Sequence, residues 1–238
     1  MERKQTRHKL PISQRLLNCA ALVPQGARVA DIGADHGYLS IELLRQGIAS
    51  YVHASELREK PLQRAIENAG KFGVADKMRF SQADGLDAIA PDEVDTVICA
   101  GMGGDLITGI IERCPWIQNP RYLLILQPQS SGNDLRRRLA ELGFSIAQET
   151  LAQDSGFLYN ILCLRYAHPQ HLTPGQQYLS PQLLESGSPL LPQYIQRIIH
   201  ALELTVEGIR RSNDPAAADK LGYYKTALAE VREMAKSL

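Results

Sequence analysis

The chain has 238 residues, of which 44% are hydrophobic and 22% charged, enough for one large globular domain with an appendage. Lys and Arg number 26 and so do Asp and Glu, so the chain lacks the net positive charge usual in nucleic-acid-binding proteins, and any RNA contact must use a local basic patch. The four cysteines form no C-x-x-C pair, which argues against a zinc site and a disulfide framework. No signal peptide is recognisable, and no apolar run approaches the roughly 20 residues of a membrane span. These features predict a soluble cytoplasmic protein.

Expected strands and helices alternate over the first 143 residues. Pro11 and the helical spacing of Ile12, Leu16 and Cys19 predict an amphipathic helix over 10–23, followed by a buried strand over 28–32. The further strands are expected over 51–55, 77–83, 94–100 and 122–126. The further helices are expected over 38–46, 59–72, a segment ending near 113, and 133–143 with Asn133 as its N-cap.

The alternation ends in two strand-like segments, 144–152 and 157–166, joined by the hairpin signal Gln153-Asp-Ser-Gly156. Five strands alternating with helices and then a terminal antiparallel hairpin are not the layout of a NAD dehydrogenase. This order resembles the class I S-adenosylmethionine-dependent methyltransferase fold, an α/β fold with a Rossmann-like seven-stranded sheet.

The rest of the chain differs in composition. Pro, Gln, Ser and Gly dominate 168–192, which predicts a linker or wrapped segment rather than a core element. Two helices should follow, joined by a turn at Ser212-Asn-Asp-Pro215. The first has an apolar edge of Ile195, Ile198, Leu202, Thr205 and Ile209. The second has a coiled-coil seam of Leu221, Tyr224, Leu228, Val231 and Ala235. We therefore expect a methyltransferase domain with an N-terminal helix over 1–167, and a linker with a helical coiled-coil hairpin over 168–238.

The stretch Arg28 to Leu39 predicts a small-molecule site where the first strand enters a helix. Gly33 and Gly37 allow a sharp turn and close approach of a ligand. Glu56 follows the next strand 23 residues after Gly33 (56 − 33 = 23), near the offset at which an acid binds a ribose. Asp35 stands where a dinucleotide fingerprint has its second glycine, which disfavours a pyrophosphate but suits a sulfonium cofactor with an ammonium group. The alternatives are an ordinary strand-to-helix turn and, for Glu56, an exposed acid at a helix start.

Further candidates follow the later strands. Asp84 could cap a short helix over 85–89 or accept a hydrogen bond from the amino group of the cofactor's adenine. Gly101 to Gly104 could be simple turn chemistry or leave room for a flat base, with Met102 as an apolar contact. Asp105 and Gln127 are the polar groups expected to face the acceptor, although both could be helix-start and strand-end residues without a catalytic part. No His, Asp or Glu spacing predicts a metal site.

Four motifs together resemble the bacterial TrmK family. These are Asp31-Ile-Gly-Ala-Asp-His-Gly-Tyr-Leu39, Ile98-Cys-Ala-Gly-Met-Gly-Gly104, Leu124-Ile-Leu-Gln-Pro128 and Asp154-Ser-Gly-Phe-Leu-Tyr159. The family are tRNA (adenine-N1)-methyltransferases that act on adenine 22, with a Rossmann-like domain and a C-terminal coiled-coil hairpin. The resemblance implies S-adenosylmethionine as cofactor and tRNA as partner. It implies a cofactor site made of Asp31, Gly33, Asp35, His36, Gly37, Glu56, Asp84, Gly85, Gly101 and Met102. Gly37, where the family is expected to have Ala, and Gln129, where Asn is usual, depart from the pattern.

RNA binding by this chain would depend on local basic residues. The candidates are Arg3, Lys4, Arg7, Lys9 and Arg15 at the N-terminus and Arg210 and Arg211 near the hairpin tip. The run Arg136 to Arg138 is another basic patch, although a solvated helix face is its commoner meaning. Two other classes stay open: a methyltransferase of another RNA, a protein or a small molecule, and a non-catalytic RNA- or partner-binding relative.

Overall fold

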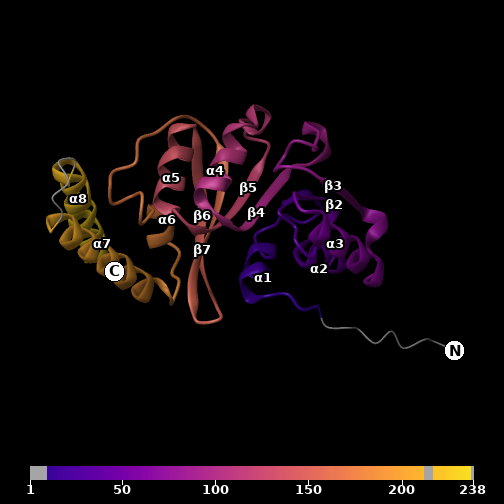
Figure 1. The fold of residues 1–238 in the computed structure, drawn as a ribbon, viewed down its shortest axis with the longest axis horizontal. Helices are drawn as coiled ribbons and strands as arrows, with labels where there is room; N and C mark the ends of the chain where they lie inside the picture. Colours follow the sequence, from indigo (N-terminus) through magenta and orange to yellow (C-terminus); the bar gives the residue numbers. More distant parts are fainter. Residues whose placement is uncertain (1–9, 212–216, 237–238) are drawn as a thin grey trace. The chain divides into compact units, whose positions relative to one another are not determined.

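The computed structural model describes residues 10–211 and 217–236, and the chain divides into two compact units, Met1–Thr96 and Val97–Leu238. Seven strands form one mixed sheet in the order β3-β2-β1-β4-β5-β7-β6 (Figure 1). The strands are β1 Ala27–Ile32, β2 Ala49–Glu56, β3 Met78–Gln82, β4 Thr96–Gly103, β5 Leu123–Ser130, β6 Phe144–Asp154 and β7 Phe157–Tyr166. The α-helices are α1 Gln14–Ala20, α2 Tyr38–Arg45, α3 Glu59–Lys71, α4 Gly104–Glu112, α5 Gly132–Glu141, α6 Pro181–Leu184, α7 Leu191–Arg210 and α8 Ala217–Ala235.

In the first unit, three parallel strands carry the helices α2 and α3. Residue Asp31 pairs with Ala54 and Ile32 pairs with Ser55, so β1 and β2 end side by side. Both helices pack against β2, and Val29 on β1 and Val52 on β2 are completely buried. The register therefore brings the carboxyl ends of the strands to one edge, where polar residues follow each of them.

In the second unit, β7 is antiparallel to both β5 and β6. The turn between β6 and β7 has only two residues, Ser155 and Gly156, with φ of 50° and 83°. Two successive residues with positive φ fit the twist of a tight antiparallel hairpin. The long β6–β7 hairpin thus forms this edge of the sheet, as its turn residues predict.

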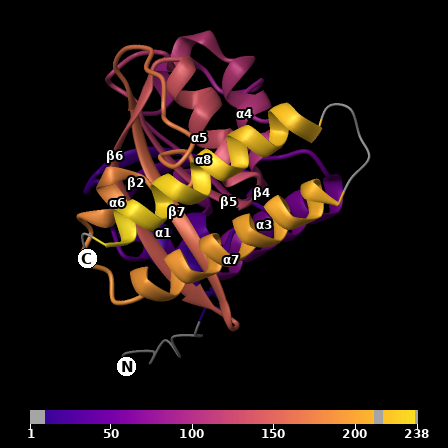
Figure 2. The same ribbon diagram turned by 90° about the vertical axis from the view of Figure 1, so that its left-hand side faces the viewer.

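The helices α7 and α8 lie side by side and run in opposite directions (Figures 1 and 2). Their apolar faces share one core with the β6–β7 hairpin and the segment before α7. This core contains Leu151, Leu158, Leu179, Leu183, Leu191, Tyr194, Ile195, Ile198, Leu202, Ala227, Leu228 and Val231. The helical hairpin is therefore packed onto the strands β6 and β7, so its stability depends on them.

A buried ion pair lies beside this core. The guanidinium of Arg136 on α5 pairs with Glu149 on β6, and both side chains are almost completely buried. Glu149 also accepts hydrogen bonds from Asn160 Nδ2 at 2.9 Å and from Ser180 Oγ at 2.5 Å. Burial acts against the charged form of Arg136, but the Glu149 carboxylate raises the pKa of this guanidinium, which stays charged. Four segments, α5, β6, β7 and the stretch before α6, are thus held by one set of charge-assisted hydrogen bonds.

The predicted fold class, a Rossmann-like methyltransferase sheet with a terminal antiparallel hairpin and a C-terminal helical hairpin, is confirmed. The predicted division between residues 167 and 168 stays a prediction. The predicted turn at 212–215 lies outside the described residues. Within residues 10–211 and 217–236, no helix combines the length and the apolar composition that a membrane crossing requires.

Several local expectations were wrong. The first helix starts only after Ser13, whose hydroxyl accepts a hydrogen bond from the N–H of Leu16, so the segment from Leu10 is not helical. The N-cap of α5 is Ser131, not Asn133, which lies within the first turn of this helix. No helix forms over 85–89, where the chain makes turns instead.

The segment 168–192 also differs from the expectation of a linker. Leu179 and Leu183 are completely buried and belong to the core beneath α7. On α7 itself, Val206 is buried, whereas the predicted edge residues Thr205 and Ile209 are only partly covered. The prediction missed that Leu179 and Leu183 hold this segment in the core, because the segment as a whole contains few apolar residues.

Candidate functional site

The acid Asp31 lies near the end of β1 and is only 4% exposed. Its Oδ2 accepts a hydrogen bond of 2.5 Å from Ser40 Oγ on α2. Burial raises the pKa of this carboxyl to about 6; hydrogen bonds from Ser40 oppose the rise, and the charge of Glu56 adds to it. A buried carboxylate without a cationic partner is energetically costly. Asp31 therefore suits a ligand that brings positive charge or hydrogen-bond donors.

A second buried acid, Glu56, ends β2. Its Oε2 accepts the N–H of Asp35 at 3.3 Å, and its Oε1 accepts the N–H of Arg58 at 3.0 Å and Arg58 Nε at 3.4 Å. These bonds fix the carboxylate against the loop that follows β1. Since each carboxylate oxygen has two lone pairs, Glu56 keeps acceptor capacity for the two hydroxyls of a ribose.

The loop Gly33–Gly37 is tightly held. The N–H groups of Gly33 and Ala34 both donate to Ser55 O, at 2.8 and 3.2 Å. Asp35 has φ of 48°, a left-handed conformation that Asp tolerates better than most residues. At Gly37 φ is 73°, and an added Cβ would lie 3.1 Å from Ala65 Cβ, so glycine is favoured at this departure from the family pattern. The ring of His36 stacks on Tyr38 beside this loop.

The turn after β3 reaches the same edge. Ser55 Oγ donates to Gly85 O at 2.8 Å, and the N–H of Ala83 donates to Glu56 O at 3.2 Å. Asp84 is exposed between these anchors. These hydrogen bonds bring the loop after β1, the end of β2 and this turn together, as the spacing of their acids predicts. Among the described residues, no three His, Cys, Asp or Glu side chains are grouped as a metal site would need.

In the second unit, the stretch Gly101–Gly104 is not a loop. Residues 101–103 continue β4, and α4 begins directly at Gly104. The N–H of Gly101 donates to Gln127 Oε1 at 3.0 Å, and Gln127 Nε2 donates to Pro128 O at 3.0 Å. Gln127 is completely buried. Its amide therefore holds the ends of β4 and β5 together, which favours a positioning role over contact with the acceptor.

Asp105 lies in the first turn of α4 with its side chain 72% exposed. It accepts a hydrogen bond of 2.8 Å from Ser131 Oγ, and Arg138 Nη1 lies 4.0 Å from its Oδ1. The side chain of Met102 is partly exposed just before it. Of the two polar residues predicted to face the acceptor, Asp105 alone has an accessible functional group.

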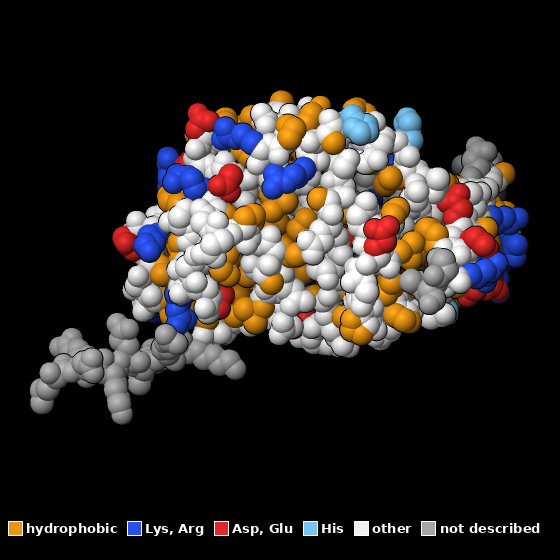
Figure 3. All heavy atoms as spheres, turned by 180° about the vertical axis from the view of Figure 1, so that it is seen from behind, with side chains coloured by type: hydrophobic (Ala, Val, Ile, Leu, Met, Phe, Trp, Pro, Cys, Tyr) orange, Lys and Arg blue, Asp and Glu red, His pale blue; other side chains and the backbone are white. Residues whose placement is uncertain are grey.

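The predicted RNA-binding residues fall into three sets. Arg3, Lys4, Arg7 and Lys9 lie outside the described residues, and Arg15 is a partly exposed residue of α1. Arg210 and Arg211 are exposed at the end of α7, and Arg211 forms an ion pair with Glu207. On the face drawn in Figure 3, basic and acidic side chains are interspersed rather than gathered by sign, in keeping with the zero net charge.

The run Arg136 to Arg138 is not a basic patch. Arg136 is buried against Glu149, Arg137 pairs with Glu141, and Arg138 pairs with Glu112 at 2.6 Å. The solvated-face interpretation holds for the last two residues and was wrong for Arg136. The run of three arginines in α5 gave no sign that one of them points inward.

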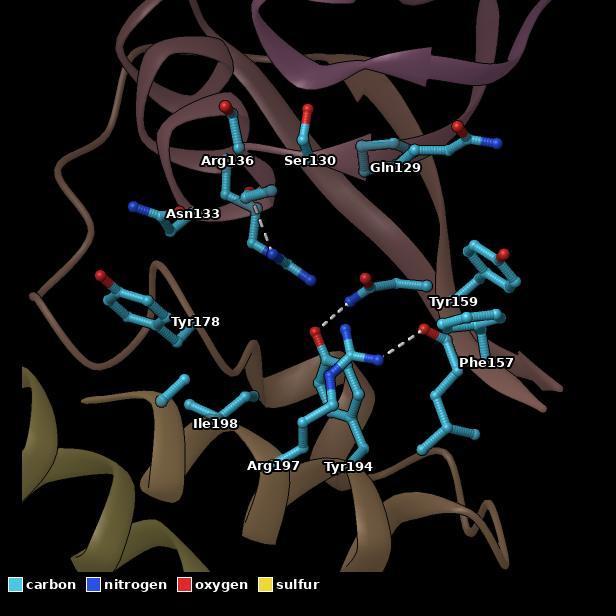
Figure 4. Close-up of a pocket in the computed structure, with 16 residues that line it drawn as sticks. Gln129, Ser130, Asn133, Arg136, Phe157, Tyr159, Tyr178, Tyr194, Arg197 and Ile198 are labelled. Atoms are coloured by element: carbon cyan, nitrogen blue, oxygen red, sulfur yellow. Dashed lines mark hydrogen bonds between the residues drawn. The ribbon is translucent and has the colours of Figure 1, made fainter. Parts of the chain in front are cut away.

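A cavity of about 390 Å³ in the second unit was not predicted (Figure 4). The C-terminal end of β5 and the start of α5 form one wall of the cavity, and β7 and α7 form the others. Aromatic rings line it at Phe157, Tyr159, Tyr178 and Tyr194. Pro128 and Tyr159, from two of the four motifs that carry the family resemblance, both border this cavity. Its α7 residues are separated from those motifs by more than thirty positions (194 − 159 = 35), so no local pattern could reveal them.

The comparisons with known proteins bear on this geometry. The family described as "Methyltransferase domain" matches residues 12–162. The chain belongs to this family. Bacillus subtilis (strain 168) tRNA (adenine(22)-N(1))-methyltransferase is 33% identical over 155 residues, which span 65% of this chain and 65% of that enzyme, just under two thirds of its length.

Two solved structures extend the similarity over nearly the whole chain. The structure of the B. subtilis m1A22 tRNA methyltransferase TrmK has a TM-score of 0.84 at 25% identity and covers 95% of this chain and 99% of that one. The structure of Streptococcus pneumoniae Sp1610 in complex with S-adenosyl-L-methionine has a TM-score of 0.77 at 34% identity and covers 91% and 99%. The predicted resemblance to the TrmK family is thereby confirmed.

Proposed function

We propose that this protein transfers a methyl group from S-adenosylmethionine to N1 of adenine 22 in tRNA. The observation that carries the proposal is the pair of buried acids, Asp31 and Glu56, at adjacent strand ends in a chain similar to an adenine-22 methyltransferase and to an S-adenosylmethionine-bound structure. With tRNA as its substrate, the protein is proposed to act in the cytoplasm.

The residues of the first unit fit this cofactor. Glu56 accepts two backbone N–H groups and keeps acceptor capacity for ribose hydroxyls. Asp31 and Asp35 supply negative charge, which suits a sulfonium and an ammonium group. The exposed Asp84 would accept from the adenine amino group, while Gly33, His36, Gly37 and Gly85 would line the site. When bound, S-adenosylmethionine supplies an electrophilic methyl group.

Methyl transfer to N1 of adenine needs little general acid–base catalysis. N1 of adenine has a lone pair, so positioning the base contributes most of the rate. N1 lies on the Watson–Crick edge, so the base must be unpaired or unstacked before it reacts. Positive charge grows on the purine, and the exposed carboxylate of Asp105 can stabilise it near the exocyclic amine. Gln127 positions the end of β4 through Gly101, and Met102 offers an apolar contact.

Transfer of labelled methyl to unmodified tRNA, followed by nucleoside analysis, tests the proposal. We expect 1-methyladenosine in tRNA with adenine at position 22 and no product in the same tRNA with guanine there. Calorimetry with S-adenosylmethionine gives a separate measure of cofactor binding. Cofactor binding without transfer to tRNA would favour another acceptor, and an absence of cofactor binding would favour a non-catalytic relative; either result contradicts the proposal.

A further inference from the structure

In the part of the chain that the structure describes, the cavity in the second unit is lined by basic and not by acidic side chains, whereas the whole chain has no net charge. Two arginines, Arg136 and Arg197, line it, and no acidic residue does among the described residues. The guanidinium of Arg197 donates to Leu158 O at 3.0 Å, lies 5.9 Å from the centroid of the Tyr194 ring and forms no ion pair with a described carboxylate. Because Glu149 compensates the charge of Arg136, the positive charge of this cavity comes from Arg197.

A buried donor inside the cavity lacks a partner. The side chain of Arg136 is 2% exposed, and its Nε has no hydrogen-bond partner. The other nitrogens of this guanidinium contact Glu149, Gly132 O and Gln177 O. Figure 4 shows the guanidinium reaching toward the middle of the cavity. Such groups are normally paired, so an unpaired donor in the wall of this cavity favours a ligand that carries a hydrogen-bond acceptor.

The walls are suited to a flat aromatic ligand. Phe157 is 63% exposed at the start of β7, and its ring centroid lies 6.5 Å from that of Tyr159 on the same face of the strand. Figure 4 shows Phe157 and Tyr159 on one side of the cavity and Tyr178 on the other. A volume of about 390 Å³ is near the lower end of small-molecule sites, the size for one nucleotide rather than a helix or a peptide. An exposed Phe beside an Arg is a typical stacking platform for a nucleobase.

We propose that this cavity holds one unpaired nucleotide of the RNA substrate next to the target adenine. Its base would stack on Phe157 and Tyr159 and accept a hydrogen bond from Arg136, and its phosphate would contact Arg197. Enzymes that extrude a base commonly grip its neighbours as well. This inference rests on the proposed function, since it names where part of the same RNA substrate binds.

The test is steady-state methylation of unmodified tRNA by Phe157→Ala. Since Phe157 is exposed, its replacement leaves the core intact. We expect the KM for tRNA to rise about tenfold, with kcat and the affinity for S-adenosylmethionine unchanged. Phe157→Tyr keeps a ring and should behave like the unchanged protein. Ile66→Ala, which removes exposed apolar surface from α3, is the matched control and should have no effect. Arg197→Gln should raise the KM for tRNA, and Arg197→Lys should raise it less.

Abasic tRNAs separate base recognition from a general loosening of the hairpin. A missing base on one side of adenine 22 should raise the KM of the unchanged protein as much as Phe157→Ala does, and the two changes together should add nothing further. Two results would overturn the inference while the proposed function stands. One is an equal KM for Phe157→Ala and Ile66→Ala. The other is that Phe157→Ala raises the KM further with each of the two tRNAs that lack the base before or after adenine 22. If the unchanged protein itself transfers no methyl to tRNA, the proposed function fails first.

Discussion

At the scale of single residues, the protonation of Asp31 links stability to ligand binding. In the unfolded chain this carboxyl ionises near its ordinary pKa of 3.8, whereas in the folded chain burial raises the pKa to about 6. The folded state therefore binds more protons between these pH values. The stability that protonated Asp31 contributes is complete below pH 3.8 and is lost as the pH rises through about 6. At neutral pH the ionised acid destabilises the fold.

Asp31→Asn is accordingly expected to stabilise the free protein. The rise of the Asp31 pKa from 3.8 to about 6 corresponds to up to about 3 kcal/mol in the free energy of unfolding above pH 7. Denaturant unfolding at pH 5 and pH 8 measures this, and the gain should be larger at pH 8. The exposed Asp76→Asn is the control and should change little at either pH. A loss of stability in Asp31→Asn at pH 8 would contradict the role assigned to burial.

The same substitution should weaken the binding of S-adenosylmethionine by tenfold or more, because the amide brings no negative charge. In the unchanged protein the affinity should fall as the pH drops below about 6, where Asp31 takes up a proton. Calorimetry across this range measures both effects. An affinity that is independent of pH, or unchanged in Asp31→Asn, would remove this acid from the cofactor site.

At the scale of elements, the junction of β4 and α4 depends on one glycine. A Cβ on Gly104 would lie 2.7 Å from both Ser130 O and Ser131 O, which are backbone atoms at the end of β5. A Cβ on Gly103 would meet only Ser130 Oγ, at 3.1 Å, and this side chain can rotate away. The two neighbouring glycines therefore differ in what surrounds them, although the sequence presents them as one glycine run.

Gly104→Ala should lower the free energy of unfolding by about 1–3 kcal/mol, because the backbone of β5 must move. Alanine is the better helix former by about 1 kcal/mol, which offsets only part of this cost. Gly103→Ala is the matched comparison and should cost less. Thermal unfolding of the two variants checks the order. If Gly103→Ala proves the more damaging, the close approach of α4 to β5 is not what constrains this turn.

These elements also show how far the sequence predicts the structure. The strands and the hairpin turn at Ser155-Gly156 follow from local periodicity and turn chemistry, which short segments express by themselves. The acids Asp31 and Glu56 were predicted from their positions after strands. Ser40, Arg136 and Arg197 were not, since each has its partner on another helix or strand, 9 to 39 positions away. Leu179 and Leu183 were missed because their segment has a polar composition although two leucines anchor it.

At the scale of the whole molecule, the packing of the helical hairpin decides how its function can be tested. Since Leu151 and Leu158 of the β6–β7 hairpin share a core with α7, deleting residues 193–238 would expose apolar strand surface. Loss of methylation after such a deletion would then report unfolding as well as RNA binding. Point substitutions that spare the core are better probes of the hairpin, and Arg210 and Arg211 at the exposed end of α7 are suitable positions.

The shared core makes a prediction about cooperativity. Ile195 on α7 is 2% exposed within this core, so Ile195→Ala should destabilise the protein by about 2–5 kcal/mol. Because α7 covers β6 and β7, amide hydrogen exchange should quicken in those strands as well as in α7. Gln196→Ala on the exposed side of the same helix is the control. Faster exchange confined to α7 and α8, with β7 protected as before, would instead mean that residues 168–238 fold independently of the methyltransferase domain.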